Sequence, residues 1–128
     1  MPTTLQAPEN FEICADYCTY QLRAKVSLVD AVERVANAIA YARAHGMPRL
    51  LVDVTELKLA GPLTLADRFL MVEDWVRASN GEVIVAIVAL PEYIHPEKFG
   101  VRLAADLGAR GDVFTSEQEA LQWLLSQR

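Results

Sequence analysis

Two short apolar runs, at residues 50–54 and 83–90, constrain the fold more than any other feature of this chain. Neither run alternates apolar with polar residues, which is typical of strands that are buried on both faces of a parallel sheet. A strand covered on both faces needs a layer of helices on each side of the sheet. The two runs therefore predict an α/β fold.

The segments between these runs supply the helices. Leu28, Val32, Val35, Ile39 and Ala42 recur at helical spacing, with Ser27 as the N-cap and Gly46 and Pro48 as the stop. Thr64 begins a second helix with Asp67 at its third position, and its predicted inner face is Leu65, Phe69, Val72 and Val76. Pro96 begins a third helix carrying Phe99, Leu103 and Leu107, and Ser116 with Glu119 caps a fourth.

The remaining strands complete the order. Residues 10–14 and 18–26 predict two antiparallel strands, residues 56–63 a loop, and residues 112–115 a last strand. The prediction is a single domain over residues 1–128, with a mixed, mostly parallel five-stranded sheet and four helices in the order ββαβαβαβα. Strands joined through helices imply parallel crossovers.

Composition and charge exclude several function classes. Acidic residues outnumber basic ones 17 to 12, for a formal net charge of −5, whereas nucleic-acid binding needs a basic face. The run at residues 83–90 is far shorter than the ~20 residues that span a bilayer, so no membrane insertion is expected. Residues 1–6 have no basic, apolar leader pattern, and a cytoplasmic protein is the default expectation.

No metal or other cofactor is expected. The chain has only two cysteines and two histidines, and no His-x-x-x-His or Cys-x-x-Cys pair. Cys14 and Cys18 fall on opposite faces of the predicted hairpin, so we expect reduced thiols rather than a disulfide.

The order of elements resembles the STAS domain, the fold of anti-sigma-factor antagonists and of the cytoplasmic tails of sulfate transporters. The run at residues 50–57 resembles the central strand and the turn after it. Residues 91–100 and 112–116 resemble the bacterial branch often labelled antagonist-like or STAS-like. The resemblance covers nearly the whole chain and implies a STAS-like fold.

One departure limits what this resemblance implies. Antagonists controlled by phosphorylation carry a serine at the start of the second helix, but residues 59–65 contain no serine. Thr64 is their only hydroxyl, and a helix N-terminus does favour phosphate. Thr64 is already explained as an N-cap, however, so the anti-sigma role does not follow.

Candidate ligand-binding residues gather where the parallel strands end, the edge at which open α/β sheets bind ligands. They are Asp53 and Thr55 after one strand, Tyr93 and His95 after the next, and Thr64, with Arg68 also expected nearby. An enzyme using Asp53, Thr55 and His95 is one hypothesis, although each residue also has a structural role in a turn or cap.

A surplus of apolar residues marks the second helix. Leu70, Met71 and Trp75 lie outside its predicted inner stripe, and such a surplus can contact a partner or be covered within the fold. Our leading hypothesis is a non-catalytic interaction or regulatory module that forms a homodimer or binds a protein partner through these residues. The alternative is a carrier or sensor of a small apolar or lipid-like ligand, by analogy with CRAL-TRIO domains.

Overall fold

The computed structural model of this chain describes residues 7–127. Residues 1–6, from which we inferred that no leader sequence is present, lie outside the described range. Its strands are β1 (Phe11–Ile13), β2 (Cys18–Gln21), β3 (Ala24–Val26), β4 (Arg49–Asp53), β5 (Leu57–Leu59), β6 (Ile84–Val88) and β7 (Gly111–Phe114). Its α-helices are α1 (Leu28–Ala44), α2 (Leu65–Ser79), α3 (Phe99–Asp106) and α4 (Glu117–Ser126), and a short 3-10 helix, η1, covers Pro91–Tyr93. Within residues 7–127, no helix combines the length and apolar character needed to cross a membrane.

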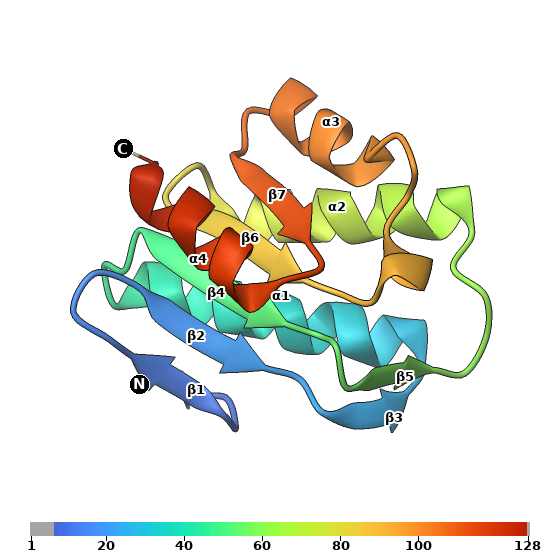
Figure 1. Ribbon diagram of the computed structural model, residues 1–128, viewed down its shortest axis with the longest axis horizontal. Helices are drawn as coiled ribbons and strands as arrows, with labels where there is room; N and C mark the ends of the chain where they lie inside the picture. The colour runs from blue at the N-terminus through green and yellow to red at the C-terminus, as the bar shows by residue number, and fades with distance from the viewer. Residues whose placement is uncertain (1–6, 128) are drawn as a thin grey trace, which may run out of the picture.

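The five-stranded sheet has the order β1-β2-β4-β6-β7 (Figure 1). β1 pairs with β2 antiparallel, whereas the β2–β4, β4–β6 and β6–β7 pairs are parallel. The predicted α/β class, with four helices and a mixed sheet of five strands, is confirmed.

Helices cover both faces of this sheet. In Figure 1, α4 lies in front of the sheet, and α1 and α2 lie behind it. Leu50 and Val52 of β4 belong to the core on the α1 side, and Leu51 belongs to the core under α4. All three side chains are at most 2% exposed. The burial of this strand on both faces, predicted because its apolar run does not alternate with polar residues, is confirmed.

Helix α1 forms as its pattern predicts. The Ser27 hydroxyl accepts a hydrogen bond from the Asp30 backbone N–H at 3.2 Å and caps the first turn. Val35 and Ile39 are nearly inaccessible and form the centre of its buried face. The chain leaves the helix through Gly46, whose φ of +66° is the left-handed conformation that glycine adopts without strain.

The predicted strand over residues 18–26 is wrong in its length. Leu22 donates its backbone N–H to the Asp53 carbonyl at 3.0 Å, and the chain then leaves the sheet. The last residues of the predicted strand form β3, which pairs in parallel with β5 in a small separate sheet of two strands. β5 lies inside the predicted loop at residues 56–63, where Leu57 and Leu59 alternate with a single lysine. A three-residue strand beside Gly61 and Pro62 carries too short a pattern to be distinguished from a loop.

The predicted inner face of α2 is correct for Val72 and Val76 but wrong for Leu65 and Phe69. Leu65 is 54% exposed and Phe69 is 44% exposed, whereas Val72 and Ser79 are buried. The helix turns a neighbouring stripe toward the sheet, and that stripe contains Arg68, Met71, Val72, Trp75, Val76 and Ser79. Both stripes have helical spacing, so periodicity alone does not decide between them.

Helix α3 departs from its prediction in the same way. It begins at Phe99 rather than Pro96, because residues 95–98 form a turn closed by a hydrogen bond from the Lys98 N–H to the His95 carbonyl at 2.8 Å. Leu107, predicted to face inward, is 48% exposed. The residues that face the interior are the smaller Gly100, Val101 and Ala104.

Candidate functional site

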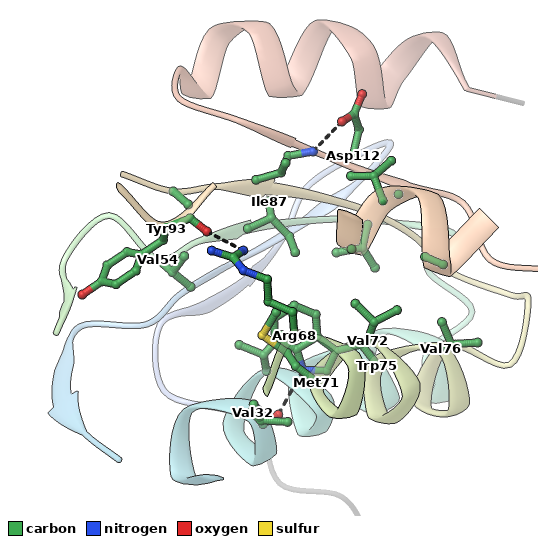
Figure 2. A pocket seen from close by; sticks show the side chains of 18 of the residues that line it. Val32, Val54, Arg68, Met71, Val72, Trp75, Val76, Ile87, Tyr93 and Asp112 are labelled. Carbon is green, nitrogen blue, oxygen red and sulfur yellow. Dashed lines mark hydrogen bonds between the residues drawn. The ribbon is translucent and has the colours of Figure 1, made fainter. Parts of the chain in front are cut away.

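A cavity of about 170 Å³ lies between the sheet and the helices α1, α2 and α3. Most of its wall is apolar. The wall includes Val32, Val35 and Ile39 of α1, Met71, Val72, Trp75 and Val76 of α2, Val85 and Ile87 of β6, and Val101 and Ala104 of α3. Figure 2 shows α1 and α2 on one side of this space and the sheet on the other. An apolar space with a few polar groups is the usual form of a small-molecule site.

Trp75 ties the two helices of this wall together. Its indole Nε1 donates a hydrogen bond to the Val32 carbonyl of α1 at 3.1 Å (Figure 2). Met71 lies one turn earlier on the same side of α2 and also lines the cavity. Both side chains are half-buried, whereas Leu70 is 63% exposed. Of the three residues predicted to form a partner interface, only Leu70 therefore lies away from the cavity.

Arg68 is the charged residue that reaches into this apolar space. Figure 2 shows its guanidinium among Val54, Met71 and Tyr93, and its Nη1 donates to the Tyr93 carbonyl at 2.9 Å. Among residues 7–127, no carboxylate forms an ion pair with Arg68. Burial lowers the pKa of its guanidinium, because desolvation disfavours the charged form. This arginine keeps its charge in a poorly solvated place without an acidic neighbour to balance it.

Lys98 and Asp112 form a second polar group at the rim. The Lys98 Nζ lies 2.7 Å from Asp112 Oδ1 and 5.5 Å from the centre of the Phe114 ring. Asp112 Oδ1 also accepts the backbone N–H of Val113 at 2.7 Å. Exposed Arg110 lines the same rim. The cavity is thus lined by more positive than negative side chains, although the whole chain carries a net charge of −5.

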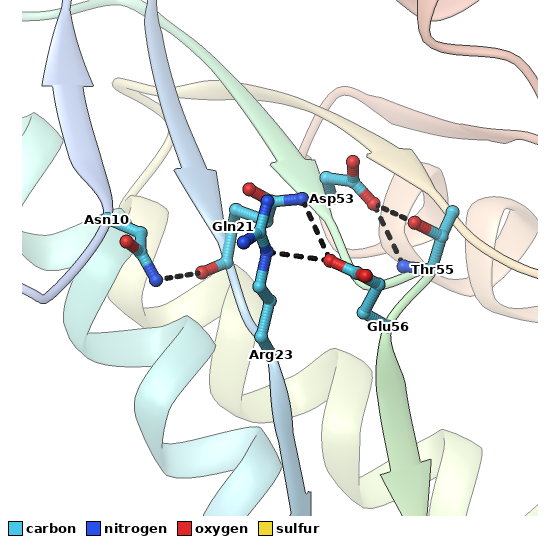
Figure 3. A network of polar contacts seen from close by, with 6 residues as sticks. All are labelled: Asn10, Gln21, Arg23, Asp53, Thr55 and Glu56. Atoms are coloured by element: carbon cyan, nitrogen blue, oxygen red, sulfur yellow. Dashed lines mark hydrogen bonds and ion pairs between the residues drawn. The ribbon is translucent and has the colours of Figure 1, made fainter.

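Asp53 and Thr55 form hydrogen bonds with each other and do not line the cavity. Asp53 Oδ1 accepts hydrogen bonds from the Thr55 backbone N–H at 2.9 Å and from its hydroxyl at 2.7 Å (Figure 3). Next to them, Glu56 pairs with Arg23 at 2.6 Å and lies 3.5 Å from the Gln21 amide. The two hydrogen bonds between Asp53 and Thr55 close the turn between β4 and β5. This is the structural role that we considered for these residues as the alternative to catalysis.

Tyr93 and His95, in contrast, both line the cavity. The Tyr93 carbonyl holds Arg68, and His95 Nδ1 accepts the Glu97 backbone N–H at 3.1 Å. No hydrogen bond joins His95 to Asp53 or Thr55 in the part of the chain that the structure describes. The geometry therefore gives the enzyme hypothesis no nucleophile and base in contact.

Thr64 caps α2. Its hydroxyl accepts the Asp67 N–H at 3.1 Å, and the Asp67 carboxylate accepts the Thr64 N–H at 3.0 Å, so the two residues form a capping box. The hydrogen bond that the Thr64 backbone N–H donates to the carboxylate, and next the Thr64 side chain, lower the pKa of Asp67. Thr64 lies one turn before Arg68 but does not line the cavity.

The structure brings together Tyr93, His95, Met71 and Trp75 of the predicted site residues, and it adds Arg68, which the sequence placed near the strand ends without assigning it a role. An arginine within an apolar stripe was the available signal, because its long stem packs with apolar neighbours. Over the described range, 7–127, no group of three potential metal-ligating side chains lies close enough to hold an ion. No protein-family model, curated protein or solved structure matches this chain.

Proposed function

We propose that this chain is a non-catalytic binding domain of STAS-like architecture that holds a small apolar molecule between its sheet and its helices. One observation carries the proposal, namely a cavity of about 170 Å³ with a mostly apolar wall. The STAS-like part rests on the resemblance of residues 50–57 and 91–100. The cytoplasmic location stays a prediction.

The cavity matters because protein interiors are close-packed and seldom leave spaces larger than a water molecule. A fully enclosed cavity costs about 24 cal/mol per Å³, which for this volume gives a ceiling of about 4 kcal/mol. A loss of stability of that size would be a large fraction of the net stability of a domain, which is on the order of 5–15 kcal/mol. A dry apolar cavity of about 150 Å³ binds benzene, so the ligand body here has roughly six carbon atoms.

The test uses 1-hexanol as a neutral, apolar probe of the right size. Binding is followed through the fluorescence of Trp75, which lines the cavity, in a Trp123→Phe background. Trp123 packs against Phe114 on the α4 side, so its removal leaves a single reporter at the cavity. We expect a saturable change in the fluorescence of Trp75.

A matched pair of variants tests whether hexanol binds inside the cavity. Ala104 lines the cavity, whereas Ala105 is exposed on the same helix. Ala104→Leu is expected to abolish saturable hexanol binding, and Ala105→Leu is expected to leave it unchanged. An equal effect of the two variants, or no saturable binding by the parent protein, would show that the cavity is not a ligand site.

A second candidate function is self-association through α2, but with a different set of interface residues from the one predicted from the sequence. Leu65, Phe69 and Leu70 are all exposed, and their spacing places them on adjoining faces of α2. Exposed apolar groups of this kind favour a protein contact, here a second copy of the chain. Sedimentation velocity of the parent protein and of Leu70→Lys tests it. A monomer at all concentrations in the parent protein would remove this candidate.

A further inference from the structure

Arg68 is the half-buried cation of the cavity wall, no acidic side chain among residues 7–127 balances its charge, and this charge restricts which apolar molecule fits. From this juxtaposition of Arg68 with an apolar wall, we propose that the ligand is a monocarboxylate with an apolar body of roughly six carbon atoms, whose carboxylate binds Arg68. This inference rests on the proposed function, because it specifies the ligand of the same cavity.

The hydrogen bonds of Arg68 leave donors free for a ligand. A guanidinium has five N–H donors in a planar fork that matches the two oxygens of a carboxylate. Arg68 uses Nη1 for the Tyr93 carbonyl at 2.9 Å, and its other nitrogens make no hydrogen bond to any of residues 7–127. The Tyr93 carbonyl also fixes the position of the guanidinium, so a carboxylate would meet a group that is already oriented.

Charge balance favours a ligand with a single negative charge. The Lys98 ammonium lies 2.7 Å from Asp112, so its charge is already neutralised, and Arg110 is exposed to water at the rim. Among the cavity-lining cations of residues 7–127, Arg68 is the one that is half-buried in the apolar wall without an ion-pair partner. A monoanion placed there gives a neutral, half-buried pair, whereas a phosphate dianion would bring an excess negative charge to a partly desolvated site.

The helix that carries Arg68 supports the same assignment. Arg68 lies on the stripe of α2 that contains Met71, Val72 and Trp75, so the cation and the apolar wall come from one rigid element. The aliphatic stem of the arginine extends the apolar surface, and its charged end lies beside Tyr93 and Val54 (Figure 2). A molecule with an apolar body and a carboxylate at one end has the matching arrangement.

The experiment compares hexanoate with 1-hexanol, two probes with the same carbon chain and different head groups. Binding to the Trp123→Phe protein is measured by Trp75 fluorescence and by titration calorimetry at pH 7.5. We expect hexanoate to bind more tightly than hexanol. In Arg68→Gln, the affinity for hexanoate should fall about 10- to 100-fold, the range for a lost charge-assisted hydrogen bond, while that for hexanol changes little.

Two further variants serve as controls. Arg77→Gln removes the same charge from the exposed side of α2, where Arg77 pairs with Asp74, and we expect it to leave the affinity for hexanoate unchanged. Arg68→Lys keeps the charge without the planar fork and should retain part of the affinity for hexanoate.

The outcomes separate this inference from the proposed function. If neither probe binds the parent protein, the proposed function fails and this inference fails with it. If hexanol binds but hexanoate gains nothing from Arg68, only the carboxylate assignment is overturned. If Arg68→Gln loses both probes equally, Arg68 builds the wall and is not the anion site. Tighter binding of hexyl phosphate than of hexanoate would also overturn the monocarboxylate class.

Discussion

Filling the cavity from α3 should make the protein more stable, and the size of this effect follows from the structure. Ala104→Leu adds three carbon atoms at a position that lines the cavity. Burying one such carbon contributes about 0.8 kcal/mol, so complete burial of all three would contribute about 2.4 kcal/mol. Because Ala104 is only half-buried, we expect roughly half of this, about 1 kcal/mol.

The control for this effect is Ala105→Leu on the exposed side of the same helix. Leucine and alanine both favour helices, so the small difference in helix propensity is the same for both variants and cancels in the comparison. Urea unfolding followed by far-ultraviolet circular dichroism gives the free energy of unfolding of each protein. We expect Ala104→Leu to be more stable than Ala105→Leu by about 1 kcal/mol, which corresponds to a few degrees in melting temperature.

The result that would refute this reasoning is a loss of stability specific to Ala104→Leu. Adding carbon to a core that is already full forces side chains off their preferred rotamers and costs about 1–3 kcal/mol. A loss of that size, absent in Ala105→Leu, would mean that the interior beside α3 is packed. Both the proposed function and the carboxylate assignment would then lose their basis.

Three further predictions concern a cap, a thiol and a surface. Thr64→Ala should cost about 1 kcal/mol of unfolding free energy in urea, because it removes the hydroxyl that accepts the Asp67 N–H, while Thr64→Ser should restore most of the loss. Burial raises the pKa of the Cys18 thiol from 9.0 to about 12, so Ellman's reagent at pH 8 should label Cys14 alone until the chain is unfolded, and labelling of two thiols in the native protein would contradict this burial. The raised value also means that stability present below pH 9 is lost as the pH rises toward 12, and urea unfolding of Cys18→Ala should show a smaller alkaline loss than the parent protein. At a concentration at which the parent protein is a monomer, Leu70→Lys should leave the unfolding free energy within about 0.5 kcal/mol of the parent value, because this side chain is exposed, and a larger loss would place it in the core.

Local signals in the sequence were enough for the elements that depend on local physics. Ser27 and Thr64 both cap the helices that they were predicted to begin, because an N-cap depends on a side chain and a backbone N–H three residues away. The central strands could be predicted because an apolar run without alternation, such as residues 83–90, is typical of a strand in a sheet covered on both faces. The parallel ribbon of β3 and β5 could not, because its pairing joins residues that are distant in the sequence.

The inward faces of α2 and α3 lay beyond sequence reasoning for a different reason. On α2, the stripe of Leu65 and Phe69 and the stripe of Met71 and Trp75 have equivalent spacing, and the first contains the residues more easily taken for core. Which stripe faces the sheet depends on how the helix packs against α1, where Trp75 donates to the Val32 carbonyl. That hydrogen bond is a tertiary contact. The sequence could therefore place Arg68 near the strand ends, but it could not predict that this side chain faces a cavity.

The choice of inward residues explains why the cavity exists at all. Stability alone favours the larger apolar side chains on the inner face of a helix, because each buried carbon contributes to folding. Helix α3 instead presents Val101 and the small Ala104 to the cavity, whereas Leu107, at its C-cap, is exposed. Natural sequences depart from the rule of a well-packed core chiefly where function requires it. Space beside an unpaired arginine is what a carboxylate ligand needs. The gain in unfolding free energy expected from Ala104→Leu therefore measures how much stability is lost by leaving that space unfilled.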